Sequence, residues 1–159
     1  MNEKEILQIL MATLGAFGFA ILFNIRGYKL LASAIGGALG WTLYLLLHRV
    51  IHSDMIAYFI VAVIISLYAE VMAKLLKAPS TIFIAPSIIP LVPGASLYYT
   101  MTYALDRNLE MFSAKASTTV TIAVALAVGL VVSTVLVELF ERIKMMRKRA
   151  KENTLNITK

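Results

Sequence analysis

The sequence predicts an all-α integral membrane protein, a bundle of about five transmembrane helices in which a proline-rich segment breaks the fourth. The chain of 159 residues is 60% hydrophobic and only 15% charged. A soluble domain of this size leaves a large share of its surface in water, so it has no room to hide this many apolar side chains. A lipid bilayer removes the conflict, because its hydrocarbon core solvates apolar side chains.

Five apolar stretches divide the chain, and short charged connectors separate them. Each stretch approaches or exceeds the roughly 18 residues that a helix needs to cross about 30 Å of hydrocarbon. Two acidic residues, Glu70 and Glu138, are the charges inside them. We therefore expect a transmembrane domain over residues 1–141 and a basic tail over residues 142–159, with spans at about 6–23, 30–47, 55–73, 81–105 and 116–140.

The basic residues predict how the chain is oriented, because lysine and arginine favour the cytoplasmic side of a membrane. Five spans place the two termini on opposite sides. With the tail in the cytoplasm, 11 of the 15 basic residues lie inside, and the reverse orientation inverts this excess. We expect the N-terminus outside and the C-terminus inside. A four-span alternative, in which residues 81–105 fold back, is less consistent because it separates Lys74 and Lys77 from the tail.

The net charge of +6 is concentrated in the tail rather than spread over a face. A basic cluster directly after the last apolar run is typical of contact with anionic lipid, so the lipid bilayer is the expected partner and nucleic acid is not. No hydrolase motif or phosphate-binding glycine loop occurs, so we expect neither an enzyme nor a cofactor. The tail cluster consists of Arg142, Lys144, Arg147, Lys148, Arg149 and Lys151.

Small residues recur at every fourth position on three of the spans. They allow helix backbones to approach closely, and helix association inside lipid depends on such packing. The stripes predict either packing within this chain or, for one of them, contact with a partner subunit. They comprise Ala12, Ala16 and Ala20, then Ala32, Gly36 and Gly40, and finally Ser117, Thr121, Ala125, Gly129 and Ser133.

The fourth span is interrupted by Pro86, Pro90, Pro93 and Gly94. Each proline lacks an N–H group and crowds the carbonyl four residues earlier, and the residue before a proline is biased away from helical angles. We expect two half-helices joined by extended backbone. The alternative is a proline kink that only shapes the bundle.

Broken helices of this kind form the substrate sites of many transporters. The second half-helix is expected to begin between Gly94 and Ser96, where free N–H groups and the positive end of the helix dipole favour an anion. Nearby hydroxyl groups complete a site suited to a small carboxylate. The candidate substrate-binding residues are Pro86, Ser87, Pro90, Pro93, Gly94, Ser96, Tyr99 and Thr100.

Three further positions carry hypotheses of their own. Glu70 is an acid inside a span and a candidate coupling residue, although Lys74 four residues later favours a simple ion pair. Asn24 follows the first span, either as a helix cap or at the inner mouth of a pathway. His48 and His52 share a helix face, but two ligands do not make a zinc site, so no metal is expected. Trp41 is typical of an interfacial aromatic anchor.

The segment Ile88-Ile-Pro90-Leu-Val-Pro93-Gly94, together with Lys77-Ala-Pro79 and Phe83, resembles the signature of the threonine/serine exporter family. Gly18-Phe-Ala-Ile-Leu-Phe-Asn24 is similar to the first span of that family. The resemblance implies export of threonine, serine or related carboxylates through the inner membrane of bacteria or archaea. Long members fuse a larger half to a five-span half like this one, so it also implies a small subunit that works with a larger family member or as a homo-oligomer.

Two functions from different classes therefore remain after the sequence is read. One is a subunit of a secondary transporter with a carboxylate site at the broken fourth helix. The other is a membrane scaffold that does not transport, whose kink and small-residue faces serve assembly. Protection of residues 86–94 by substrate would distinguish them.

Overall fold

A computed structural model describes residues 2–157 of the chain, and their side chains as far as Arg147. Every regular element in this part is helical, which confirms the predicted all-α fold. The elements are α1 (Glu3–Leu22), α2 (Tyr28–Ile51), α3 (Asp54–Leu75), α4 (Thr81–Ile88), the 3-10 turn η1 (Ile89–Leu91), α5 (Gly94–Leu105) and α6 (Leu109–Ile157).

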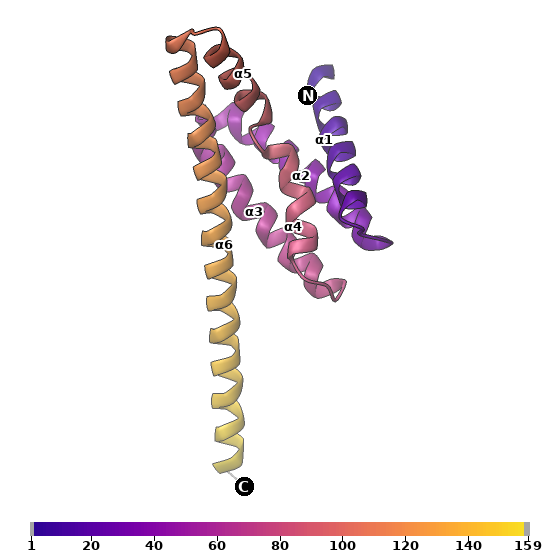
Figure 1. The fold of residues 1–159 in the computed structure, drawn as a ribbon. Helices are drawn as coiled ribbons and strands as arrows, with labels where there is room; N and C mark the ends of the chain where they lie inside the picture. The colour runs from indigo at the N-terminus through magenta and orange to yellow at the C-terminus, as the bar shows by residue number, and fades with distance from the viewer. Residues whose placement is uncertain (1, 158–159) are drawn as a thin grey trace.

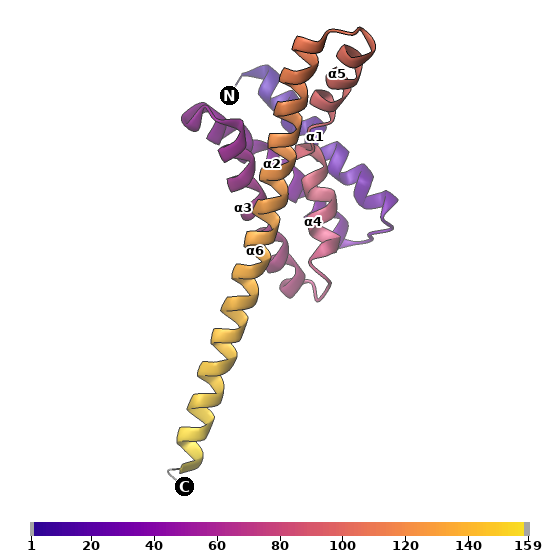
Figure 2. The ribbon, with the colours of Figure 1, turned by 60° about the vertical axis from the view of Figure 1, so that its left-hand side comes forward.

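Four helices, α1, α2, α3 and α6, are individually long and apolar enough to cross a membrane. The segment from α4 to α5 makes a fifth crossing if this bent pair counts as one span. The two termini lie at opposite ends of the bundle in both views (Figures 1 and 2), as five crossings require. α6 continues to Ile157 and extends well beyond the other helices, so the basic residues from 142 onward prolong the last span.

The first connection shows how the sequence ends a helix. Asn24 adopts a left-handed φ of 56°, and the N–H of Ile25 donates to the carbonyl of Ala20 at 3.0 Å. This is the Schellman arrangement, which supplies donors to the last carbonyls of a helix. Gly27, with a φ of 66°, then turns the chain into α2. The interpretation of Asn24 as a cap is therefore confirmed.

The small-residue stripes pack inside this chain. A Cβ atom added at Gly129 of α6 would lie 2.7 Å from the Cβ of Ala62 and 2.8 Å from the carbonyl oxygen of Phe59, both on α3. One added at Gly37 of α2 would lie 2.4 Å from the Cβ of Ala16 on α1. Glycine is required at both places because the backbones approach too closely for a side chain. For these positions the structure favours intrachain packing over contact with a partner.

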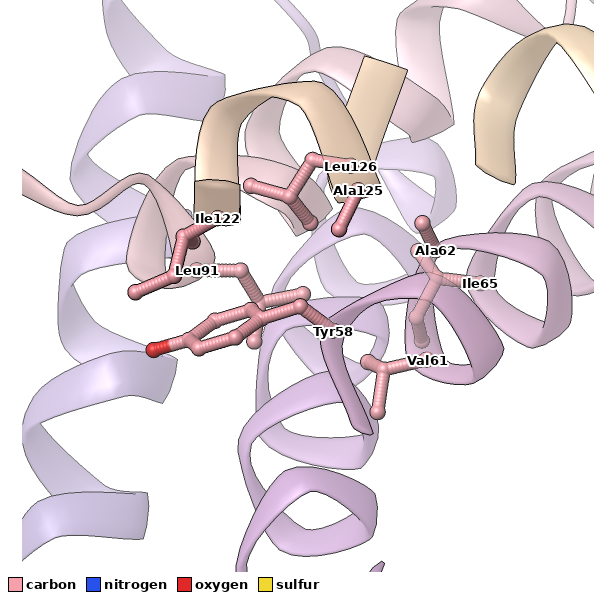
Figure 3. Close-up of a cluster of buried hydrophobic side chains, with 8 residues drawn as sticks. All are labelled: Tyr58, Val61, Ala62, Ile65, Leu91, Ile122, Ala125 and Leu126. Carbon is pink, nitrogen blue, oxygen red and sulfur yellow. The ribbon is translucent and has the colours of Figure 1, made fainter. Parts of the chain in front are cut away.

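Helix α3 lies at the centre of the fold and packs against α2, α4 and α6. Its face toward α6 forms the largest buried apolar cluster, which also includes Leu91 of η1 (Figure 3). Leu91 is only 1% exposed. The broken segment is therefore anchored in the core at Leu91, one residue before the backbone leaves helical geometry. The cluster consists of Tyr58, Val61, Ala62, Ile65, Leu91, Ile122, Ala125 and Leu126.

Candidate functional site

The broken fourth span consists of α4, η1 and α5, with a bend of 49° between its two halves. The predicted pair of half-helices is confirmed, but the break is shorter than expected. Pro86 lies inside α4, and Ile89, which precedes Pro90, keeps helical angles. Val92, which precedes Pro93, is the residue that becomes extended, with φ −61° and ψ 131°. The irregular backbone is therefore confined to the two residues before α5.

The helix tolerates Pro86 because another helix supplies the hydrogen bond that proline removes. Proline at position 86 leaves the carbonyl of Ile82 without its usual donor. The hydroxyl of Ser33 on α2 lies 3.2 Å from that carbonyl oxygen, and it shares its one proton with the carbonyl of Lys29, which lies 3.0 Å away on α2 itself. Inside a membrane a freed backbone group must be satisfied by protein or water, and Ser33 does this here.

Ser87 is fully buried in the same contact between α2 and α4. Its hydroxyl donates to the carbonyl of Ser33 at 3.2 Å. A Cβ added at Gly36 would lie 2.0 Å from this hydroxyl oxygen, so the absent side chain of Gly36 makes room for it. Pro86 is buried beside it. Of these two predicted site residues, Ser87 therefore contacts α2, and Pro86 is buried within the bundle.

Ser96 and Thr100 lie beyond the break, and their hydroxyls meet α6 instead. The Thr119 hydroxyl oxygen lies 2.9 Å from Ser96 Oγ and 2.8 Å from the carbonyl oxygen of Lys115, and the Thr100 and Thr119 hydroxyl oxygens are 3.4 Å apart. Thr100 also donates to the carbonyl of Ser96 at 2.8 Å. The predicted hydroxyl residues thus form two groups that bond to different helices, and the sequence did not indicate Thr119 as the partner.

The start of α5 faces open space. Gly94 is exposed, and a Cβ added there would meet no atom within 4 Å. Its N–H donates to the carbonyl of Val92 at 2.7 Å, while the N–H groups of Ala95 and Ser96 have no backbone acceptor among residues 2–157. Tyr99, one turn further, is 49% exposed. The positive end of a helix is therefore accessible at the break.

A cavity of about 260 Å³ is lined by residues of α1, α2 and η1 near the break. Pro90, one of the predicted site residues, forms part of its wall. The sequence signal that was missed is helical spacing, because four of the lining residues occupy one face of α1 at positions i, i+3, i+4 and i+7. The lining residues are Gln8, Met11, Ala12, Gly15, Trp41, Ile89 and Pro90.

Glu70 lies half-buried on α3, where it borders two grooves against α6 of about 450 and 460 Å³. The expected ion pair between Glu70 and Lys74 does not form. Lys74 instead pairs with Glu141 of α6, across the helix interface. Glu70 thus remains beside this ion pair without being part of it, and its coupling role stays a prediction.

Asn24 borders a basic groove of about 510 Å³ at the end of the bundle where α4 begins. Its side-chain oxygen accepts a hydrogen bond from Arg26 Nε at 3.1 Å, and Lys29 and Ile82 also line the groove. The two interpretations of Asn24 are therefore compatible. Its backbone caps α1, and its side chain borders the groove that is the predicted mouth of a pathway.

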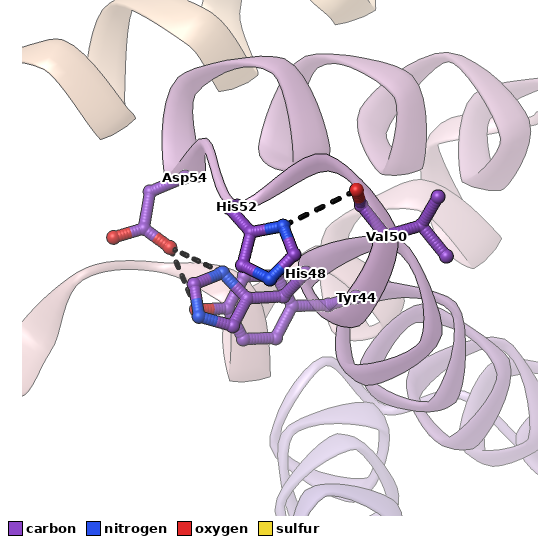
Figure 4. Close-up of polar contacts among 5 residues, drawn as sticks. All are labelled: Tyr44, His48, Val50, His52 and Asp54. Carbon is purple, nitrogen blue, oxygen red and sulfur yellow. Dashed lines mark hydrogen bonds and ion pairs between the residues drawn. The ribbon is translucent and has the colours of Figure 1, made fainter.

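The two histidines have different partners at the turn between α2 and α3 (Figure 4). His48 Nδ1 lies 3.1 Å from Asp54 Oδ1, and this oxygen also accepts the Tyr44 hydroxyl at 3.0 Å. His52 Nδ1 lies 3.3 Å from the carbonyl oxygen of Val50. Within the described residues, no three His, Asp or Glu side chains gather as metal ligands. The network links α2 to α3 at the turn between them.

Comparison with known proteins gives one result for this chain. A family model described as "Threonine/Serine exporter, ThrE" matches residues 8–136, which cover α1 through most of α6 and include the break. No curated protein and no solved structure matches the chain.

Proposed function

Because the chain belongs to the threonine/serine exporter family, we propose that it is a subunit of a secondary transporter whose carboxylate site lies at the broken fourth helix. Family membership and the apolar helices make it a multi-pass membrane protein of amino-acid export. The substrate proposed for the site is threonine, serine or a related small carboxylate. Its role is to bind and pass this substrate, with no chemical step and no catalytic residue.

The observation that carries this proposal is the open start of α5. Val92 lies 11 residues after the first residue of α4, which corresponds to about 16 Å and hence to about the middle of the hydrocarbon layer. Backbone N–H groups at that depth cannot face lipid, so protein, water or a ligand must meet them. A carboxylate satisfies the N–H groups of Ala95 and Ser96 and interacts favourably with the helix dipole.

The basic residues at one end of the bundle support export, from the cytoplasmic end toward the outer side. The groove beside Asn24 carries Arg26 and Lys29, and it lies at the end of the bundle from which the basic part of α6 extends. The excess of basic residues assigns this end to the cytoplasm, with the N-terminus outside. A positive entrance raises the local concentration of a carboxylate substrate, and the break then lies between this entrance and the outer side.

A second membrane subunit completes the proposed site. The helix that α5 mainly contacts is α6, so one side of α5 is left without a protein neighbour. Large apolar and aromatic side chains, Leu97, Tyr98 and Met101 among them, are exposed there. Because the break must be shielded from lipid, we infer that a larger family member or another copy of this chain covers it.

A scaffold that does not transport is favoured by a different observation, the burial of Pro86 and Ser87. Ser87 holds α4 against α2, and this contact shapes the bundle whether or not a substrate binds. The two functions make opposite predictions for the flux carried by each assembled complex. If the chain is only a scaffold, a substitution at residues 86–94 changes the amount of complex that assembles. If these residues form the site, the substitution changes the flux through each assembled complex.

The test compares two glycines that both face open space, Gly94 at the break and Gly18 on α1. Gly94→Val adds a side chain beside the proposed anion site without an internal clash, while Gly18→Val adds the same side chain elsewhere. Flux of threonine is measured in vesicles and divided by the amount of assembled complex. Gly94→Val is expected to reduce this flux at least tenfold and Gly18→Val to leave it unchanged. Equal flux in the two variants contradicts the proposal.

A further inference from the structure

Helix α6 is longer than a membrane crossing requires. Its residue Glu141 pairs with Lys74 in the last turn of α3, and the helix continues from there to Ile157. At 1.5 Å per residue, the part after Glu141 is about 24 Å long. Figures 1 and 2 show it projecting past the other helices. Residues 142–157, which we call the stalk, therefore leave the helix bundle.

One face of α6 stays apolar from the end of the last span into the stalk. Positions on this face alternate at intervals of three and four residues, the spacing of a coiled-coil seam. All but one are apolar, and a single asparagine in such a seam helps to fix its register. The four whose side chains the structure describes are between 39% and 62% exposed, so the rest of the described chain leaves them uncovered. This stripe consists of Leu136, Leu139, Ile143, Met146, Ala150, Asn153 and Ile157.

The sequence gives the stalk no place to bend onto the membrane surface. Sharp kinks in helices occur mainly at proline, at glycine and serine pairs or at inserted groups, and neither proline nor glycine follows Gly129 in this chain. The stalk therefore continues the axis of the last span and carries its part of the stripe out of the lipid into water. A contiguous apolar surface exposed to water marks an interaction site, and a helix this short is only marginally stable alone.

Arginines flank the stripe on both sides. In the heptad register of the stripe, Arg142 and Arg149 follow one edge and Arg147 follows the other. Residues at these edges face the partner helix in a coiled coil and select the partner by charge. In a parallel pair of stalks Arg142 would face Arg147 of the second copy, and an antiparallel pair would also set arginine against arginine. Like charges make a second copy a poor partner, whereas a helix edged with Asp and Glu is complementary.

We propose that the stalk is a docking site for an acidic amphipathic helix of another protein, which pairs with it as a coiled coil. The partner helix supplies an apolar seam against the stripe and carboxylates against the three arginines. This contact lies outside the membrane and does not depend on the proposed carboxylate site. The competing occupant is the anionic membrane surface, on which many basic amphipathic helices lie. A stalk that stands upright brings only its first basic residues near the headgroups.

The test uses the full chain in nanodiscs of neutral lipid and two synthetic peptides as probes. Both peptides carry leucine along a heptad seam, and they differ only in having glutamate or lysine at the edges of that seam. Fluorescence anisotropy of the labelled peptide measures binding. The glutamate peptide is expected to bind saturably, and the lysine peptide at least about tenfold more weakly. Equal binding of the two peptides, or binding of neither, overturns the inference.

Two adjacent methionines provide a matched pair of variants. Met146 belongs to the stripe and is 62% exposed, whereas Met145 lies outside it and is 57% exposed. Met146→Gln is expected to weaken binding of the glutamate peptide about tenfold, because an apolar contact of the seam is lost. Met145→Gln keeps the same charge and should leave binding unchanged. Equal effects of the two substitutions contradict the docking of a helix on the stripe.

A single label distinguishes the acidic partner from the membrane and from a second copy. The chain has no cysteine, so Lys151→Cys provides one attachment site. A fluorophore there should escape quenching by nitroxide headgroups in nanodiscs that contain phosphatidylglycerol. Strong quenching means that the stalk lies on the membrane and overturns the inference. A spin label at the same position detects paired stalks, and a short label-to-label distance that Met146→Gln lengthens overturns it as well.

Crosslinking in cells tests for a natural partner. A photoreactive phenylalanine replaces Met146 in one variant and Met145 in the other, and mass spectrometry maps the crosslinked segments. Crosslinks specific to position 146 are expected in a segment where Asp and Glu flank an apolar heptad. Crosslinks from position 146 to lipid, to another copy of this chain or to a segment without that pattern contradict the inference.

Discussion

The contact between α3 and α6 and the region around the break are built in opposite ways. At the first, Gly129 brings two backbones together over an apolar cluster with Leu126 and Ile65. At the second, Gly94 faces open space and α5 packs mainly on one neighbour among the described residues. The difference indicates that the α3–α6 contact is a fixed support and that the break is where the protein meets something else.

The largest expected effect is a loss of thermal stability at the contact between α3 and α6. Gly129→Leu forces a side chain against Ala62 and the backbone of Phe59, and such overpacking costs about 1–3 kcal/mol or more. We expect a marked loss of thermal stability in detergent and a low yield of folded protein. Gly18→Leu, at a site with free space, is the control and should behave like the native chain. Equal melting temperatures for the two variants would show that the helices are not this close.

The contact between α2 and α4 should respond next. Gly36→Ala places a Cβ against the hydroxyl of Ser87, so it should destabilise the protein by about 1–3 kcal/mol. Ser87→Gly in the same chain removes the clash and should recover part of this loss. The comparison requires thermal unfolding of both single variants and the double variant. Strict additivity would mean that the two residues do not touch.

Loss of the hydrogen bond that compensates Pro86 should have a moderate effect. Ser33→Ala removes a part-buried hydroxyl that the carbonyls of Ile82 and Lys29 share, at a cost of about 0.5–1.5 kcal/mol. In a Pro86→Ala background the helix supplies its own donor, so the same substitution should cost less. A double-mutant cycle measures the coupling. A cost of Ser33→Ala that is independent of residue 86 would argue against this compensation.

The smallest stability effect concerns the ion pair between α3 and α6. Lys74→Ala and Glu141→Gln remove the same exposed pair, and each should lower the melting temperature only slightly, because solvent screens exposed ion pairs. Glu70→Gln should leave stability nearly unchanged, because Lys74 pairs with Glu141.

If Glu70 relays protons, Glu70→Gln abolishes transport driven by a proton gradient and spares passive exchange. Equal losses in driven and passive flux would reject the relay.

Much of the fold could be predicted because lipid imposes simple rules. Apolar runs of sufficient length indicated each span, and the prolines indicated that residues 81–105 form two half-helices. The extent of the break could not be predicted from local preferences alone. Pro86 stays helical because Ser33, which is 49 residues from Ile82 in the chain, bonds the carbonyl that proline frees.

The composition of the candidate site was less predictable for the same reason. The sequence grouped Ser87 with Ser96 because they are near each other in the chain, yet they bond to α2 and α6 respectively. Lys74 of α3 pairs with Glu141 of α6 and not with Glu70, which lies four residues earlier on its own helix. Residue spacing along one helix does not reveal a contact with another helix. Trp41, expected as an interfacial anchor, lines a cavity because Gly37 and Gly40 bring η1 close to α2.

The central claim is that the break binds the carboxylate of the substrate, and Pro93→Ala tests it most directly. Pro93 precedes α5 and follows Val92, the residue that becomes extended. The substitution restores an N–H group and removes the bias of Val92 away from helical angles, so η1 can continue into α5 and the exposed start of α5 is lost. Flux of threonine per assembled complex and the apparent affinity are measured, with threonine methyl ester as a competitor that lacks the negative charge. We expect lower flux, weaker affinity and poor competition by the ester. Unchanged flux per complex and unchanged affinity in Pro93→Ala would place the anion site elsewhere.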